Sequence, residues 1–241
     1  SVDTNLTSLL VTSATPGEGK TTTAANLAIV LAQSGRSVIL VDADMRKPRQ
    51  HTLFELPQSP GLTDAIVASH TPPTRYVRAT NVPNLSLLTS GKVPPNPAEL
   101  LGSQRMQQLI AQLHEQAEMI IFDAPPVLAV TDAQVLANQV NGVVLIIDSE
   151  QTSRATVARA VEALARTNAN LLGAVLNRLV RSPRGYYQYD QYSAYYAETA
   201  ETAEPGEPKR TKRGRNFLDE QLLTKPELNG VYQVQPEKLE P

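Results

Sequence analysis

The sequence predicts an α/β fold, a mostly parallel sheet with helices on both faces in a three-layer sandwich. Short, nearly continuous apolar runs alternate with amphipathic stretches over residues 1–180. This alternation is typical of parallel strands that are covered on both faces. Four of the runs end in a polar side chain, namely Asp42, Asp123, Asp148 or Asn177. Because ligands of such sheets bind beyond the carboxyl ends of the strands, these residues predict a site at that edge.

The individual elements follow from local patterns. Residues 21–34 carry apolar side chains at helical spacing, and Gly35 provides a stop signal. Two further helices are expected at 105–116 and 153–167. Apolar runs predict strands at residues 9–11, 38–41, 85–88, 119–122, 143–147 and 171–176.

Two regions interrupt the alternation. Residues 46–102 are rich in proline and weakly periodic, which predicts an irregular insertion with one or two short helices, one of them at 63–69. Residues 181–241 contain few aliphatic side chains, so we expect a tyrosine-rich tail that is disordered or ordered only on docking. The predicted domains are therefore 1–180 and 181–241. Because the chain begins at Ser1 rather than Met, we expect a fragment or a processed chain.

The bulk composition narrows the class of protein. With 41% hydrophobic and 19% charged residues, the chain suits a soluble globular protein. A net charge of -2 gives no electrostatic reason to expect nucleic acid as a partner. The sequence contains no cysteine, which excludes disulfides, thiolate metal sites and cysteine nucleophiles. No signal peptide and no apolar run of roughly 18 residues is visible, so we expect a cytoplasmic location.

A glycine-rich segment, ATPGEGKT, lies between the first expected strand and the first expected helix. It follows the phosphate-loop pattern G-x-x-x-x-G-K-[ST], with alanine in place of the first glycine. Gly17 and Gly19 can adopt backbone angles closed to other residues, so that their N–H groups cradle phosphate oxygens. Lys20 reaches the outer phosphates, and the Thr21 hydroxyl is a ligand for Mg²⁺. The predicted nucleotide-binding residues of this loop are Pro16, Gly17, Glu18, Gly19, Lys20, Thr21 and Thr22.

Two other segments, VDADMR and FDAPP, place an aspartate directly after a buried strand. An unpaired carboxylate at such a place is costly unless a cation or hydrogen bonds compensate it. A magnesium ion would do so, which favours Asp42, Asp44 and Asp123 as partners of the phosphate loop. The alternative is that an aspartate at a strand end caps the next turn. For Asp132 and Asp148 both interpretations stay open, and Asp132 is also suited to start a helix after Thr131.

Together, PGEGKTT, VDADMR and IIFDAPP resemble the three Walker-type motifs of the bacterial tyrosine kinases. This family shares its P-loop branch with the septum-site and chromosome-partitioning ATPases. Relatives in division and partitioning typically carry an extra lysine early in the loop, and none occurs here between Ser13 and Glu18. The likeness covers about residues 6–180 and implies an ATP- and Mg²⁺-dependent protein-tyrosine kinase.

The resemblance implies a role for each matched residue. Lys20 would stabilise the transferring phosphate. Thr21 and Asp44 would hold Mg²⁺, and Asp123 would support the metal directly or through water. Asp42 would orient or deprotonate the incoming tyrosine hydroxyl, next to the metal. The implied catalytic residues are Lys20, Asp42, Asp44 and Asp123, and the implied metal residues are Thr21, Asp42, Asp44 and Asp123.

The end of the chain extends the likeness. Asn177 and Arg178 follow the last expected strand, where relatives contact adenine. Beyond them, six tyrosines lie within eleven residues. Such a segment can enter the active site of a neighbouring copy, although an aromatic low-complexity tail without this role is the alternative. The implied phosphate acceptors are Tyr186, Tyr187, Tyr189, Tyr192, Tyr195 and Tyr196.

The resemblance also implies partners and a process. It implies regulation of exopolysaccharide or capsule biosynthesis and export, and a membrane activator of the polysaccharide co-polymerase type, fused upstream or separate. Neighbouring copies in a homo-oligomer and a protein-tyrosine phosphatase would be further partners. The location would be the inner face of the plasma membrane. Family members usually carry an E-x-x-R-x-x-R helix before the first strand, and the present sequence begins about where that helix would end.

Three other functions compete with a kinase. A P-loop ATPase switch of the partitioning type would change shape on hydrolysis, without kinase activity. A regulatory subunit that only binds nucleotide is disfavoured by the intact set of Lys20, Asp42, Asp44 and Asp123. A small-molecule kinase would need a lid and a substrate pocket, which only residues 46–102 could provide.

Overall fold

The computed structural model describes residues 6–68 and 71–179 of the 241-residue chain. The chain divides into two units, Ser1–Asn177 and Arg178–Pro241, and of the second only Arg178 and Leu179 are described. The elements and contacts below all belong to the first unit. Among the described residues, no helix is both long and apolar enough to cross a bilayer.

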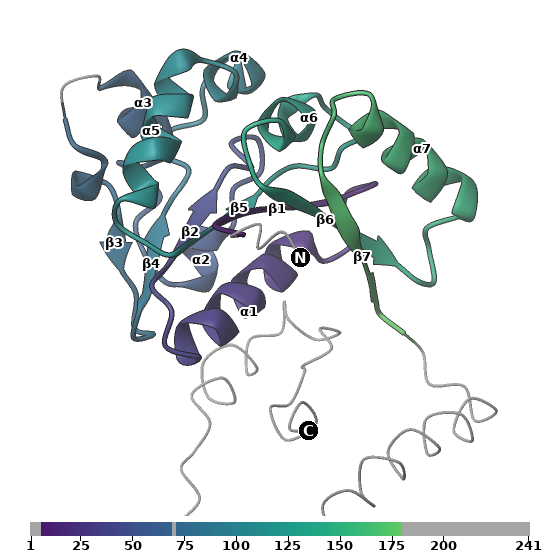
Figure 1. The fold of residues 1–241 in the computed structure, drawn as a ribbon, viewed down its shortest axis with the longest axis horizontal. Coiled ribbons are helices and arrows are strands. Elements are labelled where there is room, and N and C mark those ends of the chain that lie inside the picture. Colours follow the sequence, from purple (N-terminus) through teal and green to yellow (C-terminus); the bar gives the residue numbers. More distant parts are fainter. Residues whose placement is uncertain (1–5, 69–70, 180–241) are drawn as a thin grey trace, which may run out of the picture. The chain divides into compact units, whose positions relative to one another are not determined.

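A seven-stranded sheet forms the middle layer, in the order β3-β4-β2-β5-β1-β6-β7 (Figure 1). Neighbouring strands run parallel, except that β3 is antiparallel to β4 at one edge. The strands are β1 (Ser8–Ser13), β2 (Val38–Asp42), β3 (Arg78–Ala79), β4 (Leu85–Leu88), β5 (Met119–Asp123), β6 (Gly142–Asp148) and β7 (Leu171–Asn177).

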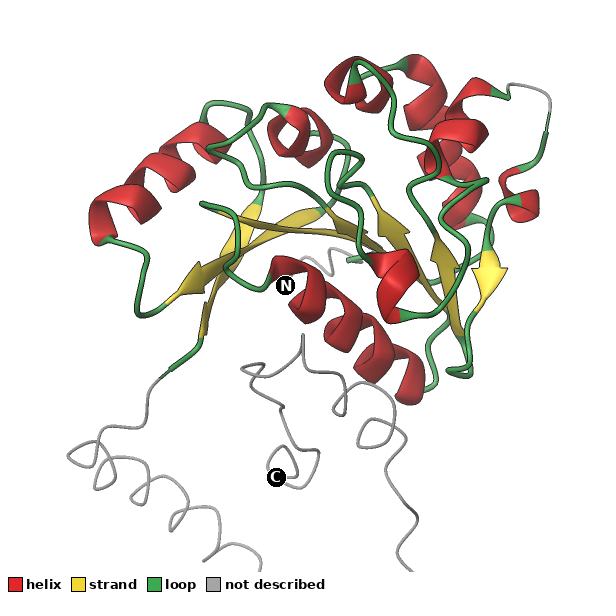
Figure 2. Ribbon diagram, turned by 180° about the vertical axis from the view of Figure 1, so that it is seen from behind, coloured by secondary structure: helices red, strands yellow, loops and turns green. Residues whose placement is uncertain are grey.

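Helices cover both faces of the sheet. Figures 1 and 2 show α1 (Lys20–Gln33) on one face and α5 (Gln104–His114), α6 (Asp132–Ala137) and α7 (Arg154–Ala165) on the other. The predicted three-layer α/β fold is therefore confirmed. The shorter helices are α2 (Gln50–Leu53), α3 (Leu62–Val67), α4 (Pro97–Leu101) and the 3-10 turn η1 (Pro73–Arg75).

The central strands are buried along their whole length. Every residue of β1, β2 and β5 is buried, as expected for parallel strands with helices on both faces. Leu10 and Phe122 are paired in register between β1 and β5 and are fully inaccessible to solvent. This core fixes the relative heights of the strands, and therefore the heights at which they end.

Residues 46–102 are more regular than the sequence predicts. Besides the expected β4 and the helix at 62–67, they form α2, η1, β3 and α4. Turns and irregular backbone separate these elements, as expected, but the short helices outnumber the predicted one or two. Tertiary burial stabilises such short elements, and local helix propensity does not reflect it. Leu62, Ile66 and Leu101, for example, are almost fully buried in the core.

The register of the strands brings two of the predicted carboxylates to the same edge. Asp42 is the register partner of Asp123 in the β2–β5 pair. Asp148 and Asn177 are partners in the β6–β7 pair. The sheet therefore presents these four polar residues along its carboxyl edge, as the sequence predicts.

We expect Phe122→Ala to lower the free energy of unfolding by about 3–5 kcal/mol, because it leaves a cavity between the sheet and its helices. Chemical denaturation of the purified chain measures this loss. Val161→Ala, at an exposed position of α7, serves as the control and should change stability by less than about 0.5 kcal/mol. A Phe122→Ala protein as stable as the control would contradict the assignment of this residue to the core.

Candidate active site

The phosphate loop leaves β1 at Ser13 and enters α1 at Lys20. Gly17 and Gly19 have φ angles of 89° and 93°, in the left-handed region that favours glycine. Gly19 is the N-cap of α1 and has no side chain to cap it, and the first turn of α1 contains no acidic residue. The N–H groups at this helix end are therefore suited to bind an anion such as a phosphate.

Glu18 shapes the loop from within. Its side chain is buried, with Oε2 accepting the Thr15 N–H at 3.0 Å and Oε1 accepting the Thr152 hydroxyl. Asn177 Nδ2 donates to the Glu18 carbonyl oxygen at 2.9 Å. In this structure both Glu18 and Asn177 therefore hold the loop through their side chains. A contact of either residue with nucleotide stays a prediction.

Lys20 is the centre of the site. Its Nζ lies 2.8 Å from Asp44 Oδ2 and 3.4 Å from Asp123 Oδ1, and also donates to Thr21 Oγ1 at 3.1 Å. Burial alone would lower the pKa of Lys20, but Asp123 and Asp44 outweigh this effect and raise the pKa above its ordinary value. Lys20 is thus a charged and buried ammonium group.

Asp123 joins this centre to β5. The residue is fully buried, and its Oδ2 accepts a hydrogen bond from Gln50 Nε2 at 3.0 Å. Burial raises the pKa of Asp123, while the Lys20 charge opposes the increase. Asp44 also stabilises the turn after β2, because its Oδ1 accepts the Lys47 N–H at 3.0 Å.

Among the site carboxylates, Asp42 has the least favourable electrostatic surroundings for a negative charge. It is fully buried, and its Oδ2 accepts the N–H groups of Arg49 and Gln50 at 3.1 and 3.0 Å. Its Oδ1 is buried and has no hydrogen-bond partner among the described residues. Burial and the neighbouring Asp123 raise the pKa of Asp42 well above its usual range. Such a group binds a proton more readily than an ordinary aspartate does.

The residues fit a magnesium ion that arrives with a nucleotide. Nowhere in the described ranges are three His, Cys, Asp or Glu side chains grouped so as to hold a metal alone. Mg²⁺ at nucleotide sites needs only one or two carboxylates, because phosphates and water supply the other ligands. The unpartnered oxygen of Asp42 and the carboxylates beside Lys20 meet this requirement.

One ion pair near the site has no counterpart in the sequence-based predictions. Arg46 binds Asp132 through two parallel hydrogen bonds of 2.9 Å, from Nε to Oδ2 and from Nη2 to Oδ1. Asp132 is fully buried at the start of α6. The pair therefore ties the segment after β2 to α6, close in sequence to Asp44. The sequence offered a helix start for Asp132, which is confirmed, but gave no sign of its partner.

The other predicted residues have diverse positions. Pro16 and Gly17 are exposed in the loop, and Thr22 is half-buried in the first turn of α1. Asp148 caps its own turn, accepting the N–H groups of Glu150 and Gln151 at 3.0 and 3.1 Å. Arg178 belongs to the second unit. The predicted phosphate acceptors, Tyr186, Tyr187, Tyr189, Tyr192, Tyr195 and Tyr196, lie outside the described residues.

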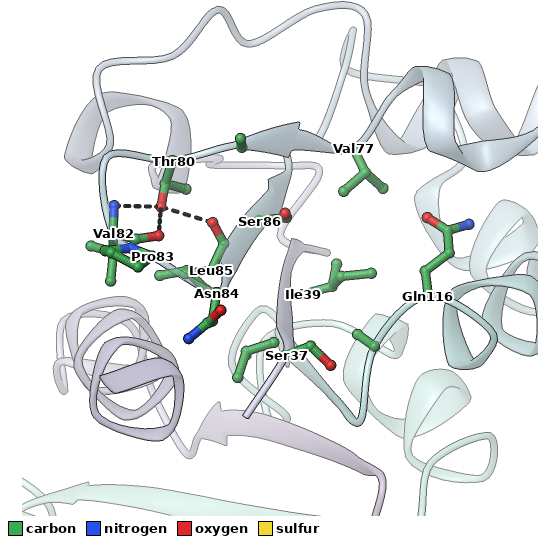
Figure 3. Close-up of a pocket in the computed structure, with 13 residues that line it drawn as sticks. Ser37, Ile39, Val77, Thr80, Val82, Pro83, Asn84, Leu85, Ser86 and Gln116 are labelled. Carbon is green, nitrogen blue, oxygen red and sulfur yellow. Dashed lines mark hydrogen bonds between the residues drawn. The ribbon is translucent and has the colours of Figure 1, made fainter. Parts of the chain in front are cut away.

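A separate concavity of about 320 Å³ lies at the amino ends of β2 and β4 (Figure 3). In it, Thr80 Oγ1 is bonded to the Leu85 carbonyl oxygen at 2.9 Å. No ionisable side chain lines this pocket, so it offers no charged group to a phosphate. The lining residues are Ser37, Val38, Ile39, Val77, Ala79, Thr80, Val82, Pro83, Asn84, Leu85, Ser86, Gln116 and Ala117.

A glycine loop at a helix start, with a buried lysine and aspartates from two adjacent strands, defines a nucleotide site of the P-loop NTPase class. Comparison with protein families agrees. Residues 6–201 match the ParA family model, which is described as NUBPL iron-transfer P-loop NTPase.

Individual relatives show to which family of P-loop NTPases the chain belongs. The chain is 48% identical to tyrosine-protein kinase YwqD of Bacillus subtilis over 189 residues, which cover 78% of this chain and 79% of that protein. It is 39% identical to the putative tyrosine-protein kinase CapB of Staphylococcus aureus, covering 76% and 80% of the two chains. A crystal structure of the chimerical protein CapA2B2 superposes with a TM-score of 0.72 at 40% identity, covering 75% and 79%. The chain therefore belongs to the bacterial tyrosine kinases, an enzyme family within the ParA-type P-loop NTPases.

We expect Gly19→Ala to reduce nucleotide affinity by at least about tenfold, since it disturbs the phosphate loop in two ways. An added Cβ would overlap the Asn177 side-chain amide, and the φ of 93° disfavours any Cβ. Gly35→Ala is the control, because Gly35 has a φ of 96° but open space around it. Titration with a fluorescent ADP analogue measures both variants. Normal binding by Gly19→Ala would contradict the described loop.

Asp42→Asn should stabilise the nucleotide-free chain at neutral pH by about 1–3 kcal/mol, because it removes a buried carboxylate whose pKa is raised. Above the ordinary aspartate pKa, the folded chain retains a proton that the unfolded chain has released. The stability of the wild type therefore falls as pH rises through the folded pKa. The gain from Asp42→Asn should consequently grow as the pH rises above the ordinary aspartate pKa.

Denaturation curves across that pH range measure the effect. Glu162→Gln removes one negative charge from an exposed site on α7 and should produce no such pH-dependent gain. A destabilised Asp42→Asn protein at pH 8 would show that Asp42 is compensated in a way that this structure does not contain.

Proposed function

We propose that this protein is an ATP- and Mg²⁺-dependent protein-tyrosine kinase that phosphorylates tyrosines of its own C-terminal tail. The observation that carries the proposal is the convergence of Lys20, Asp44 and Asp123, within 2.8 and 3.4 Å contacts, next to the phosphate loop. Phosphoryl transfer needs mainly positioning and charge stabilisation, which a lysine, a metal and two or three carboxylates supply. The family membership supports the same conclusion.

Each group has a role in this chemistry. Lys20 would bind the transferring phosphoryl group after exchanging its carboxylate partners for phosphate oxygens. Thr21 and Asp44 would hold Mg²⁺, with Asp123 in support. The metal, when bound, would neutralise charge that develops on the phosphate oxygens. Asn177 and Arg178 would contact the adenine.

Asp42 would act on the acceptor. The tyrosine oxygen would form a bond to the γ-phosphorus as the bond from phosphorus to the ADP oxygen breaks. Asp42, whose pKa is raised by burial, would accept the hydroxyl proton. The tail tyrosines 186–196 would be the acceptors, entering the site of a neighbouring copy. Successive phosphates, each with about -1.5 to -2 charge, would repel one another and weaken such an assembly.

The biological setting is proposed from the relatives. CapB is a putative tyrosine-protein kinase, and CapA2B2 is a chimerical protein of similar fold. We propose that the present chain regulates capsule or exopolysaccharide biosynthesis and export. It would act at the inner face of the plasma membrane through a co-polymerase activator, and a protein-tyrosine phosphatase would reverse its phosphorylation.

A nucleotide-driven switch without kinase activity is the second candidate. The match to the ParA family favours it, since the same fold serves both functions. The tyrosine cluster at residues 186–196 argues for the kinase, because a simple switch has no use for it. Iron transfer through thiolate ligands has no support, because the sequence contains no cysteine.

Incubation with Mg-ATP followed by mass spectrometry of the tail tests the proposal. We expect phosphotyrosine within residues 186–196, and we expect Lys20→Met and Asp42→Asn each to reduce it by at least about a hundredfold. Glu162→Gln, at an exposed position on α7, is the control and should retain the wild-type level. The assay should be repeated with a membrane activator added.

Steady ATP hydrolysis without phosphotyrosine, with or without the activator, would sink the kinase proposal and favour the switch. Phosphotyrosine that persists in both Lys20→Met and Asp42→Asn would instead point to a contaminating kinase.

A further inference from the structure

Gln50 connects three segments of the active site. It is the first residue of α2 and is completely buried. Its Nε2 donates to the Thr21 carbonyl oxygen and to Asp123 Oδ2, both at 3.0 Å. Its backbone N–H donates to Asp42 Oδ2, also at 3.0 Å. The start of α1 and the ends of β2 and β5 are thus joined through one residue.

These contacts require a side chain that donates two hydrogen bonds, as the Gln50 amide does. Each side-chain donor of Gln50 meets a buried acceptor, and one of these acceptors is the Asp123 carboxylate. A carboxylate at this position could donate neither bond, and an apolar side chain would leave Asp123 Oδ2 without this donor. The Gln50 Oε1 atom is buried and has no partner among the described residues. The side chain of Gln50 is therefore only partly satisfied by hydrogen bonds. Its two donor contacts, to Thr21 and Asp123, are the interactions that its burial maintains.

The backbone contact makes Asp42 depend on the same residue. Asp42 Oδ2 accepts the N–H groups of Arg49 and Gln50, at the point where α2 begins. Any shift of Gln50 consequently moves a donor of Asp42 and a donor of Asp123 together. These are two of the carboxylates that the proposed function assigns to the metal and the acceptor.

We propose that Gln50 is a positioning residue that holds Asp42 and Asp123 in the arrangement needed for a magnesium-bound nucleotide. This inference rests on the proposed function of the site. Residues that orient metal ligands by hydrogen bonds typically contribute about one to two orders of magnitude to metal affinity. Among the described hydrogen bonds, Gln50 contacts the predicted phosphate loop only at the Thr21 carbonyl oxygen, which cannot donate to a phosphate. Its effect should therefore be specific to the metal-bound nucleotide.

Binding of a fluorescent ADP analogue, measured with Mg²⁺ and again with EDTA, tests this role independently of catalysis. We expect Gln50→Met to weaken binding about tenfold in Mg²⁺ and to leave binding in EDTA unchanged. In the phosphorylation assay, the Mg²⁺ concentration that gives half-maximal rate should rise about tenfold as well.

Gln139→Met is the matched control. The Gln139 Nε2 atom likewise donates two hydrogen bonds, here to the main-chain carbonyls of Leu101 at 2.7 Å and Val135 at 3.3 Å. Its Oε1 is also buried without a partner among the described residues. Gln139 touches none of the site carboxylates through these bonds, so both affinities should stay at the wild-type values. If Gln50→Met does not fold, Gln50→Asn keeps an amide that is one methylene shorter, and the same Mg²⁺-specific loss is expected.

The role of Gln50 is overturned if its variants bind as tightly as the wild type in Mg²⁺, or lose affinity equally in Mg²⁺ and EDTA. A wild type whose nucleotide affinity ignores Mg²⁺ would overturn both the proposed metal site and this role. A wild type that responds to Mg²⁺ beside an unaffected Gln50→Met overturns the role of Gln50 alone.

Discussion

The site depends on a charge imbalance at the carboxyl edge of the sheet. One buried ammonium group, Lys20, faces the buried carboxylates Asp42, Asp44 and Asp123. A single positive charge cannot compensate three negative charges away from water, so the pKa values of Asp42 and Asp123 rise. The site is thus suited to additional positive charge, which a magnesium ion would bring together with the nucleotide. Lys20 contacts Asp44 and Asp123 at 2.8 and 3.4 Å and so holds these two carboxylates together.

The buried central strands hold these charged side chains in fixed positions. Asp42 and Asp123 end adjacent strands in register, and both strands are buried throughout. Moving either carboxylate toward water would require a shift of the core strands, which close packing resists. Hydrogen bonds behind the site add local control, through Gln50 to Asp42 and Asp123 and through the Arg46–Asp132 pair. Burial deprives the carboxylates of hydration, which destabilises the folded chain, and the packing of the whole sheet offsets this cost.

The same fold and site are compatible with more than one function. A phosphate loop with these carboxylates can drive either phosphoryl transfer to a hydroxyl or hydrolysis that changes the shape of the protein. Family membership places the chain with tyrosine kinases. In the sequence, the tyrosine cluster at residues 186–196 distinguishes the two functions, because only a tyrosine kinase would have a use for such residues as acceptors.

The sequence by itself determined the alternation of strands and helices, the phosphate loop, and the aspartates at strand ends. These features are local, because a strand, its polar terminus and a glycine loop are each written within a few neighbouring residues. Only the tertiary structure decided which aspartate meets Lys20, which side chains hold the loop, and how residues 46–102 become ordered. Gln50 and the Arg46–Asp132 pair act across 73 and 86 positions of the chain. Contacts of that separation depend on strand order and burial, which no local pattern in the sequence encodes.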